Sequence, residues 1–275
     1  MIEILDPGPL ATVQDLGRPG YAALGVPHSG AFDRAALRLA NRLVGNPDDA
    51  AAIELTLGGL EIRLTAAATI ALTGAPCPGA PDWGHAVSIP AGASVRLAMP
   101  PSGLRSYLAV RGGIGGERVL GSRSTDTLSG LGPDPLRRGD VLAIGPVDGE
   151  VSGAASLGSP AGDAVLPIRF GPRDDWFTAA ARARLVDVAW TVRPESDRVG
   201  IRLDGPPLSR SQDGELPSEP VLPGAVQVPS DGRPILFGPD APVTGGYPVI
   251  AVVTDLDRAA QLRPGDHVRF SPGKG

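Results

Sequence analysis

SEPVLPGAVQVPSDGRPILFGPDAPVTGGYPVIAVV, residues 218–253, alternates short apolar segments with turn sequences. Pro-Gly, Ser-Asp-Gly and Gly-Gly combinations at 223–224, 230–232 and 245–246 are typical of chain reversals. They predict three short strands, Val226–Val228, Ile235–Phe237 and Val249–Thr254. We expect these strands to meet in a small antiparallel sheet or barrel wall. A plain meander without a ligand is the alternative interpretation of the same residues.

The rest of the chain predicts a mainly β protein. Its 275 residues include 38 Gly and 30 Pro, which leave few stretches long enough for a helix. Two segments have helical spacing of apolar residues, 33–44 with Asp33 as N-cap and Gly45 after its end, and 174–188. We therefore expect many short strands and one short helix in each half.

A Gly-, Ala- and Ser-rich stretch at 148–163 separates the two halves and predicts a linker. We place an N-terminal domain at 1–150, the linker at 151–163 and a C-terminal domain at 164–275. Both halves contain a similar turn before a closing strand, LRRGD at 136–140 and LRPGD at 262–266, and PAGA at 90–93 is a weaker copy. Ordinary turn usage and a tandem pair of related barrels both explain this repetition.

Composition excludes several classes of protein. The net charge is −5, 24 of the 25 basic residues are Arg, and no basic stripe with aromatic residues indicates nucleic-acid binding. One Cys excludes an internal disulfide, and three scattered His residues argue against a metal site. No export signal or spanning segment is expected, so we predict a cytoplasmic protein without membrane contact. Lys274 is the only Lys, which excludes a catalytic Lys in the body of the chain.

Two polar clusters in the first half are candidate sites. In the loop before the first predicted helix, Ser29 and neighbouring amides could hold a carboxylate or carbonyl oxygen; a plain N-cap role for Ser29 or Asp33 is the simpler alternative. In GSRSTDT at 121–127, Arg123 and Ser124 lie among hydroxyls suited to a small polar substrate. An Arg–Asp pair that stiffens this loop is the alternative. The Gly-rich GGIGG at 112–116 lacks the GK[ST] ending of a phosphate loop and predicts a turn.

The third cluster belongs to the stretch 218–253. Gln227, Asp240, Thr244 and Tyr247 accompany the Gly245-Gly246 pair there. Asp240 could act as a general base with Thr244 and Tyr247, while the amides of Gly245 and Gly246 could stabilise an oxyanion. We expect these residues to line a pocket near Arg123 or Ser29, with Gln227 among the substrate-binding groups.

Blocks along nearly the whole chain resemble one protein family. They are TVQDLGRPGYAALGVPHSGAFD at 12–33, ALRLANRLVGNP at 36–47, RSYLAVRGGI at 105–114, VLGSRSTDT at 119–127, SDRVGIRLDGP at 196–206 and AQLRPGDHVRF at 260–270, together with the stretch 218–253. In this order they are similar to allophanate hydrolase subunit 2, KipA and the C subunit of 5-oxoprolinase, and to the carboxyltransferase region of urea carboxylase. The resemblance implies two tandem cyclophilin-like β-barrels.

The resemblance also implies a heteromeric complex. The expected function is ATP-dependent hydrolysis of 5-oxoproline to glutamate with a partner resembling KipI or the B subunit of 5-oxoprolinase, as a heterodimer or heterotetramer, and a third subunit of the lactam-utilisation type. The alternatives are biotin-dependent carboxyl transfer to a urea-like amide and non-catalytic, KipA-like relief of a histidine-kinase inhibitor. No cofactor is expected to be bound covalently; ATP would be used in the complex, and biotin would arrive on a separate carrier.

Overall fold

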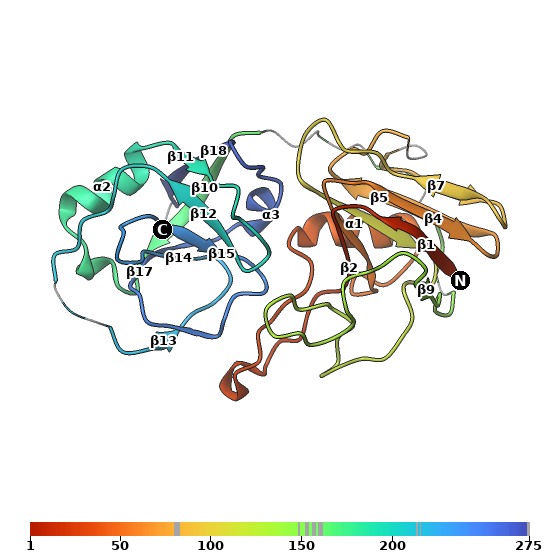
Figure 1. Cartoon of the computed structure of the whole chain (residues 1–275), viewed down its shortest axis with the longest axis horizontal. Helices are drawn as coiled ribbons and strands as arrows, with labels where there is room; N and C mark the ends of the chain where they lie inside the picture. The colour runs from red at the N-terminus through yellow and green to blue at the C-terminus, as the bar shows by residue number, and fades with distance from the viewer. Residues whose placement is uncertain are drawn as a thin grey trace. The chain divides into compact units, whose positions relative to one another are not determined.

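The computed structural model describes residues 1–79, 83–147, 149–151, 154–155, 158, 162–212, 214 and 216–273. It forms two compact units (Figure 1). Unit 1 comprises Met1–Arg18, Ser29–Asp126 and Gly130–Ala161, and unit 2 comprises Pro19–His28, Thr127–Ser129 and Gly162–Gly275. Much of the predicted linker, namely residues 148, 152–153, 156–157 and 159–161, lies outside the described residues, and the domain boundaries stay a prediction.

Unit 1 contains two open sheets. Its strands are β1 (Ile2–Pro7), β2 (Leu10–Gln14), β3 (Ala52–Thr56), β4 (Leu60–Leu64), β5 (Ala68–Gly74), β6 (Ala86–Ile89), β7 (Ser94–Arg96), β8 (Arg105–Val110) and β9 (Val141–Leu142). One sheet has the order β7-β4-β1-β9 and the other the order β2-β3-β8-β5-β6. The chain changes sheets between β1 and β2 at Gly8, whose φ of +69° and hydrogen bond to Asp6 form a tight turn. The barrel predicted for the first half is therefore replaced by two open sheets.

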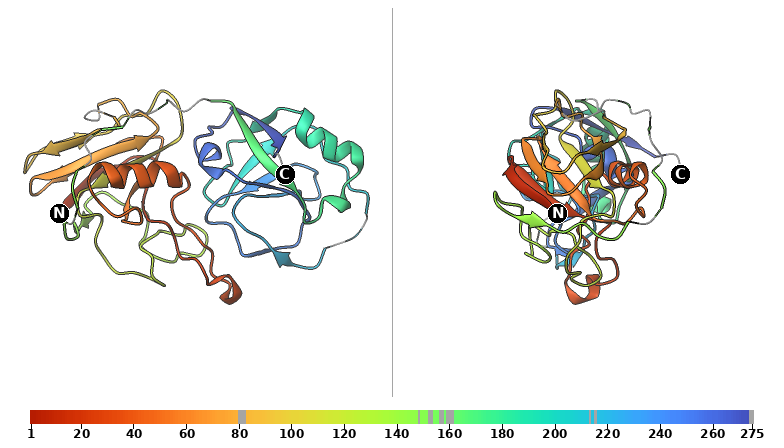
Figure 2. Two further views of the ribbon diagram at one scale, coloured as in Figure 1. Left: turned by 180° about the vertical axis from the view of Figure 1, so that it is seen from behind. Right: turned by 90° about the vertical axis from the view of Figure 1, so that its right-hand side faces the viewer.

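Alternation along the strands separates two faces of the five-stranded sheet. Ile53 and Leu55 of β3 and Leu72 of β5 face a core shared with the other sheet. The intervening residues face the helix α1 (Arg34–Leu43), which packs its buried Leu37 and Ala40 against that side. Figure 2 shows α1 against the strands of unit 1 in its left view. As predicted, Asp33 caps this helix, accepting a hydrogen bond of 2.8 Å from the amide of Ala36.

Unit 2 is built around a closed barrel with the order β10-β17-β14-β15-β12-β11-β18. These strands are β10 (Ala164–Phe170), β11 (Trp190–Val192), β12 (Gly200–Asp204), β14 (Ala225–Gln227), β15 (Ile235–Phe237), β17 (Val249–Val253) and β18 (His267–Pro272). The parallel pair β10–β18 closes the barrel. The three strands predicted from the stretch 218–253 are confirmed within a residue or two, and β14 pairs with both β15 and β17.

The remaining elements of unit 2 are short. A 3-10 turn, η2 (Asp174–Trp176), precedes α2 (Ala179–Asp187), and α3 (Leu256–Ala259) follows β17. The helix predicted at 174–188 thus begins five residues later than expected, because Thr178 rather than Asp174 caps it. Among its described residues, the second half has two short helices instead of one. A further 3-10 turn, η1 (Ala22–Leu24), lies in the segment 19–28, and the short pair β13 (Glu219–Pro220) and β16 (Thr244–Gly245) completes the unit.

The repeated Gly-Asp turn adopts one conformation in both units. Asp140 accepts a hydrogen bond of 2.7 Å from the amide of Arg137, and Asp266 accepts one of 2.7 Å from the amide of Arg263. The Gly between them has φ +92° at 139 and +93° at 265. Each of the strands that follow has an antiparallel neighbour, β1 for β9 and β11 for β18, although β18 also pairs in parallel with β10. The repetition is thus structural as well as in sequence.

Within the described residues, no helix is long and apolar enough to cross a membrane. No group of three or more His, Cys, Asp or Glu residues there could hold a metal ion.

Candidate functional site

A row of buried polar side chains crosses the helix-covered face of the five-stranded sheet in unit 1. Thr12 of β2 lies opposite Glu54 of β3, Glu54 lies opposite Tyr107 of β8, and Tyr107 lies opposite Thr73 of β5. Residues directly opposite each other in an antiparallel pair project from the same face. All four are at most 2% exposed. The row therefore concentrates polar groups in a layer that otherwise holds the apolar residues beneath α1.

Glu54 is the acceptor at the centre of this row. Its Oε2 accepts hydrogen bonds from the Tyr107 hydroxyl at 2.7 Å and from the amide of Phe32 at 3.0 Å. Its Oε1 lies 3.7 Å from Nε of Arg105, whose guanidinium stacks 4.2 Å from the centre of the Phe32 ring. Burial, and then the charge of Glu54, raise the pKa of Tyr107 well above its ordinary value of 10. Tyr107 is therefore a neutral donor that holds Glu54 in place.

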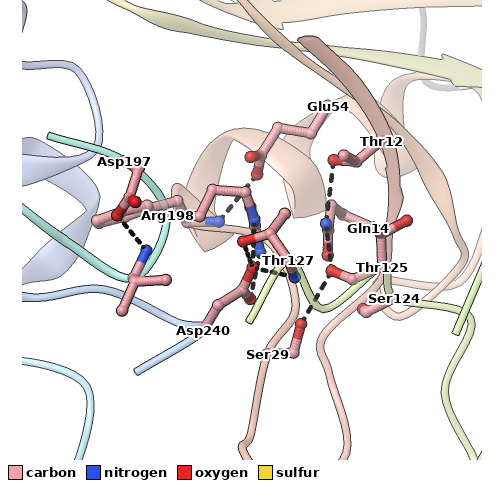
Figure 3. A network of polar contacts seen from close by, with 12 residues as sticks. Thr12, Gln14, Ser29, Glu54, Ser124, Thr125, Thr127, Asp197, Arg198 and Asp240 are labelled. Carbon is pink, nitrogen blue, oxygen red and sulfur yellow. Dashed lines mark hydrogen bonds and ion pairs between the residues drawn. The ribbon is translucent and has the colours of Figure 1, made fainter. Parts of the chain in front are cut away.

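Gln14 and Thr125 meet beside this row. Nε2 of Gln14 donates to the carbonyl of Thr125 at 2.9 Å and to Oγ1 of Thr12 at 3.0 Å. The hydroxyl of Ser29 donates to the same Thr125 carbonyl at 3.1 Å (Figure 3). Oε1 of Gln14 and Oγ1 of Thr125 have no hydrogen-bond partner among the described residues. Two buried polar atoms at one contact are thus left unsatisfied by the protein.

Asp15 holds the loop that carries Thr125. Its carboxylate accepts from the hydroxyls of Ser122 and Ser124, each at 2.6 Å, and from the amides of Arg123 at 2.6 Å and Gly17 at 2.8 Å. The Arg123 side chain donates to the carbonyl of Gly116 at 2.8 Å. A carboxylate with this many donors is a strong anchor. Arg123 and Ser124, predicted as substrate-binding residues, are therefore loop-forming contacts of Asp15 in this structure.

Arg18 supplies a buried cation to the same loop. Its guanidinium is 1% exposed and donates to the carbonyls of Ser124 and Val119. Nη1 has no hydrogen-bond partner, and no carboxylate pairs with Arg18 within the part of the chain that the structure describes. The backbone also packs closely here, since a Cβ added to Gly132 would lie 2.1 Å from the Ser124 carbonyl oxygen. Arg18 thus holds the loop by donating hydrogen bonds to the backbone carbonyls of the loop residues.

Unit 2 contains a separate buried ion pair between Arg198 and Asp240. Nε and Nη2 of Arg198 each lie 2.9 Å from a different oxygen of Asp240, and both side chains are at most 1% exposed. Oδ2 of Asp240 also accepts from the amide and hydroxyl of Thr127, at 2.9 and 2.8 Å. Burial alone would raise the pKa of Asp240, but the charge and hydrogen bonds of Arg198, with those of Thr127, outweigh it, so the pKa lies below its ordinary value of 3.8. Asp240 is therefore ionised, and both of its carboxylate oxygens accept hydrogen bonds from the protein.

The Thr-Gly-Gly-Tyr turn is arranged around Gln227. The Gln227 amide donates to the carbonyl of Tyr247 at 2.9 Å, and a Cβ added to Gly245 would lie 2.5 Å from the same nitrogen. Gly at 245 therefore admits a buried side chain of the protein itself. Thr244 is exposed, and the 45%-exposed Tyr247 ring lies 5.9 Å from the guanidinium carbon of Arg210.

The structure brings together some of the predicted site residues. Gln227 contacts the turn that contains Gly245, Gly246 and Tyr247. No hydrogen bond or ion pair joins Asp240 to Thr244 or Tyr247 within the described residues. The catalytic roles assigned to these three residues stay predictions, as do the binding roles of the other six. Sequence reasoning missed Gln14, Asp15 and Arg198, and it included Thr125 only as one hydroxyl of the segment 121–127. Each of the four lies in a block that carries the family resemblance.

The Gly-rich turn at 112–116 does not fit a nucleotide phosphate. The amides of Gly112, Gly113, Ile114 and Gly115 already donate, each at 2.8 Å, to the side chain of Asn46 and to three backbone carbonyls. A phosphate loop needs its amides unoccupied. The prediction of a plain turn is confirmed, and we place no step involving ATP on this turn.

A family profile, a related protein sequence and solved structures all relate this chain to the same family. A family profile described as carboxyltransferase domain, subdomain A and B, matches residues 24–272. The chain is 40% identical to the C subunit of 5-oxoprolinase from Escherichia coli K12 over 98% of its length and 90% of that protein. The crystal structure of TTHA0988 matches with a TM-score of 0.89 and 33% identity, over 98% of this chain and 55% of that one.

The urea amidolyase of K. lactis matches with a TM-score of 0.91 and 29% identity, over 98% of this chain and 18% of that one. The chain thus spans about half of the first solved relative and under a fifth of the second, but nine tenths of the E. coli protein. The chain belongs to the carboxyltransferase domain, subdomain A and B, family.

Proposed function

We propose that this chain is one subunit of a heteromeric, ATP-dependent 5-oxoprolinase. It would act with a partner resembling KipI or the B subunit of 5-oxoprolinase and with a third subunit of the lactam-utilisation type. The observation that carries the proposal is the 40% identity to the E. coli C subunit of that enzyme, across 98% of this chain and 90% of that protein. Because so little of either chain is left unmatched, the likeness extends to the whole subunit rather than to one shared domain.

The reaction must add water across the ring amide of 5-oxoproline, which breaks the C–N bond and leaves the carboxylate and amine of glutamate. An amide carbonyl is a weak electrophile, so ATP would activate it by transferring its γ-phosphoryl group to the lactam oxygen, with ADP as the leaving group. Attack of water on the activated carbon would then open the ring and release inorganic phosphate. This chain's contribution would be to bind and orient the amide. The buried acceptors and hydroxyls of unit 1 support that role, since amides are recognised by paired donors and acceptors.

Catalytic roles for Asp240, Thr244 and Tyr247 remain part of this proposal. Asp240 could accept a proton only after its contacts with Arg198 and Thr127 are broken, since these occupy both of its oxygens. In its described geometry it is better suited to hold Thr127 in place. Substitution of Asp240 with Asn can separate the two roles.

Reconstitution tests the proposed activity. The tagged full chain would be co-expressed with its KipI-like partner and the third subunit, isolated by gel filtration, and supplied with ATP and 5-oxoproline. We expect co-elution with the partner and glutamate release that stops when ATP or any one of the proteins is omitted. A monomer that does not bind the partner, or glutamate release that is unchanged without this chain, would overturn the proposal.

Biotin-dependent carboxyl transfer is the second candidate. The TM-score of 0.91 to the K. lactis urea amidolyase favours it. The only Lys of the chain is at position 274, in a sequence unlike a biotin carrier, so biotin would arrive on another protein. Incubation with a carboxybiotin carrier and urea distinguishes the two: carboxylated urea supports transfer, and glutamate from 5-oxoproline supports hydrolysis.

A further inference from the structure

Two polar atoms of unit 1 are buried at a single contact without any partner. Gln14 is 0% exposed and Thr125 is 2% exposed, and their side chains present Oε1 and Oγ1 respectively with no hydrogen bond among the described residues. Leaving a buried acceptor or hydroxyl unsatisfied costs about 1–3 kcal/mol. Such atoms in a folded protein call for an explanation, and a bound ligand or an ordered water would satisfy them.

The orientation of the Gln14 amide follows from its neighbours. The carbonyl oxygen of Thr125 can only accept, so the Gln14 atom 2.9 Å from it must be the NH2 group. The Thr12 hydroxyl lies 3.0 Å from the same nitrogen. Both N–H donors of Gln14 are thereby occupied, and Oε1 is left as an acceptor that requires an N–H or O–H group from elsewhere.

The hydroxyl of Thr125 supplies the complementary group. The backbone of Thr125 is held on both sides, because its amide donates to the carbonyl of Val13 at 2.9 Å and its own carbonyl accepts from Gln14 and Ser29. Its Oγ1 accepts no hydrogen bond and donates none within the described residues. An unsatisfied acceptor on Gln14 and an unsatisfied hydroxyl on Thr125 thus belong to two buried residues that are in direct contact through the Gln14 amide nitrogen and the Thr125 carbonyl.

The surrounding loop is held tightly. Ser29 has φ +53°, a left-handed conformation that is uncommon for a residue with a side chain, and its hydroxyl reaches the Thr125 carbonyl at 3.1 Å. The next residue, Gly30, packs so closely that an added Cβ would lie 2.7 Å from the amide nitrogen of Gly17. The Gln14–Thr125 contact is thus rigid, as recognition of a small ligand requires.

We propose that Gln14 and Thr125 bind the edge of an amide whose N–H and C=O point the same way. Oε1 of Gln14 accepts from the N–H, and the Thr125 hydroxyl donates to the C=O. Five-membered lactams and urea both present this edge, whereas a typical trans peptide bond does not. The inference rests on the proposed function for the choice of 5-oxoproline as first probe, but the contact itself selects the amide edge and not a carboxylate.

Binding of small amides to the full chain, alone and with its partner, tests this assignment without ATP. The probes are 5-oxoproline, 2-pyrrolidinone and urea, with proline as the matched compound that lacks the amide. Calorimetry or ligand-observed NMR measures each affinity. We expect the amides to bind and proline to bind more weakly. Preference for 5-oxoproline over urea assigns the ligand to the lactam class, and the reverse preference assigns it to the urea class.

Thr125→Val is the decisive variant because it keeps the shape of the side chain and removes only the hydroxyl. No protein contact is lost, so folding stability should be unchanged or slightly higher, while amide binding should weaken about tenfold, the value of one hydrogen bond. Thr125→Ser restores the hydroxyl and should restore binding.

Ser106→Ala is the matched control. The buried Ser106 hydroxyl donates to the carbonyl of Ala75 at 2.7 Å, so this variant should lose stability and retain amide binding. If no amide binds either form of the protein, or if Thr125→Val binds every probe as the wild type does, the two atoms are satisfied by water only and the inference is wrong. Loss of glutamate release with amide binding intact would instead contradict the proposed function alone.

Discussion

Replacing Asp240 with Asn separates an anchoring role from a catalytic one. The substitution keeps the size of the side chain, removes its charge and turns one acceptor oxygen into an NH2 group that faces the donors of Arg198 or Thr127. Arg198 is 1% exposed and Asp240 0%, so solvent cannot compensate the remaining cation. Removing one partner of a buried ion pair costs about 3–5 kcal/mol. We expect a loss of this size in the free energy of unfolding of unit 2.

Urea unfolding followed by tryptophan fluorescence measures this loss. Trp190 is fully buried in the barrel of unit 2 and reports on its unfolding. With a typical urea slope of about 2 kcal/mol per molar, the midpoint should fall by roughly 2 M. In a cycle with Arg198→Met, the double variant should be more stable than the sum of the single losses predicts, by about 2–3 kcal/mol.

Asp204→Asn is the control for this substitution. Asp204 pairs with Arg233 at 2.9 Å, but the two side chains are 57% and 45% exposed, so its removal should change stability by about 1 kcal/mol or less. Unfolding of Asp240→Asn at the same urea concentration as the wild type would contradict the anchoring role of Asp240. If the urea midpoint were unchanged but turnover of the assembled enzyme fell about a hundredfold, the carboxylate would act as the general base rather than as an anchor.

Three further predictions concern Asp240, the packing of Gly132 and the predicted linker. Folding lowers the pKa of Asp240, so the ionised carboxylate contributes its full stabilisation above pH 3.8. This stabilisation is lost as the pH falls through the pKa that Asp240 has in the folded protein. The acid unfolding curves of the wild type and Asp240→Asn should therefore converge below pH 3.8. Gly132→Ala places a Cβ 2.1 Å from the Ser124 carbonyl oxygen and should destabilise the fold strongly. Gly130 also has positive φ but nothing within 4 Å of an added Cβ, so Gly130→Ala should cost only roughly 1 kcal/mol, and Gly132→Ala should cost well over that. Equal midpoints of the two variants in thermal unfolding would contradict this expectation. Protease should cut within residues 148–163 while both fragments stay folded. Resistance of this segment, with cleavage elsewhere, would contradict the predicted domain boundary.

Local features of the fold could be predicted from sequence because they depend on few neighbouring residues. Asp33 caps α1 three residues from the amide it accepts from, and the Gly-Asp turns at 139–140 and 265–266 close within four residues. The strands β14, β15 and β17 are bounded by turns whose residues indicate reversal directly. The start of α2 differs from the prediction because Asp174 and Thr178 both suit an N-cap; Asp174 begins a 3-10 turn, and Thr178 caps the helix.

The candidate site could not be predicted because it depends on register between distant strands. Thr12 and Glu54 share a face only because β2 and β3 pair in one register, and a slip of one residue would place them on opposite faces. Asp240 drew attention through its neighbours in sequence, but its partner Arg198 lies 42 residues away on another loop. A buried charge requires a partner, yet sequence alone does not say which of 24 Arg residues supplies it.

The stoichiometry of the assembled reaction shows whether this chain acts as a subunit of a 5-oxoprolinase. Glutamate and ADP would be measured from one preparation of the partner proteins, with the wild-type chain added, omitted or replaced by Thr125→Val. We predict that glutamate and ADP form in equal amounts only when this chain is present, and that the Thr125→Val variant needs about tenfold more 5-oxoproline for the same rate. Equal glutamate formation with and without the chain would contradict its role as a subunit of a 5-oxoprolinase.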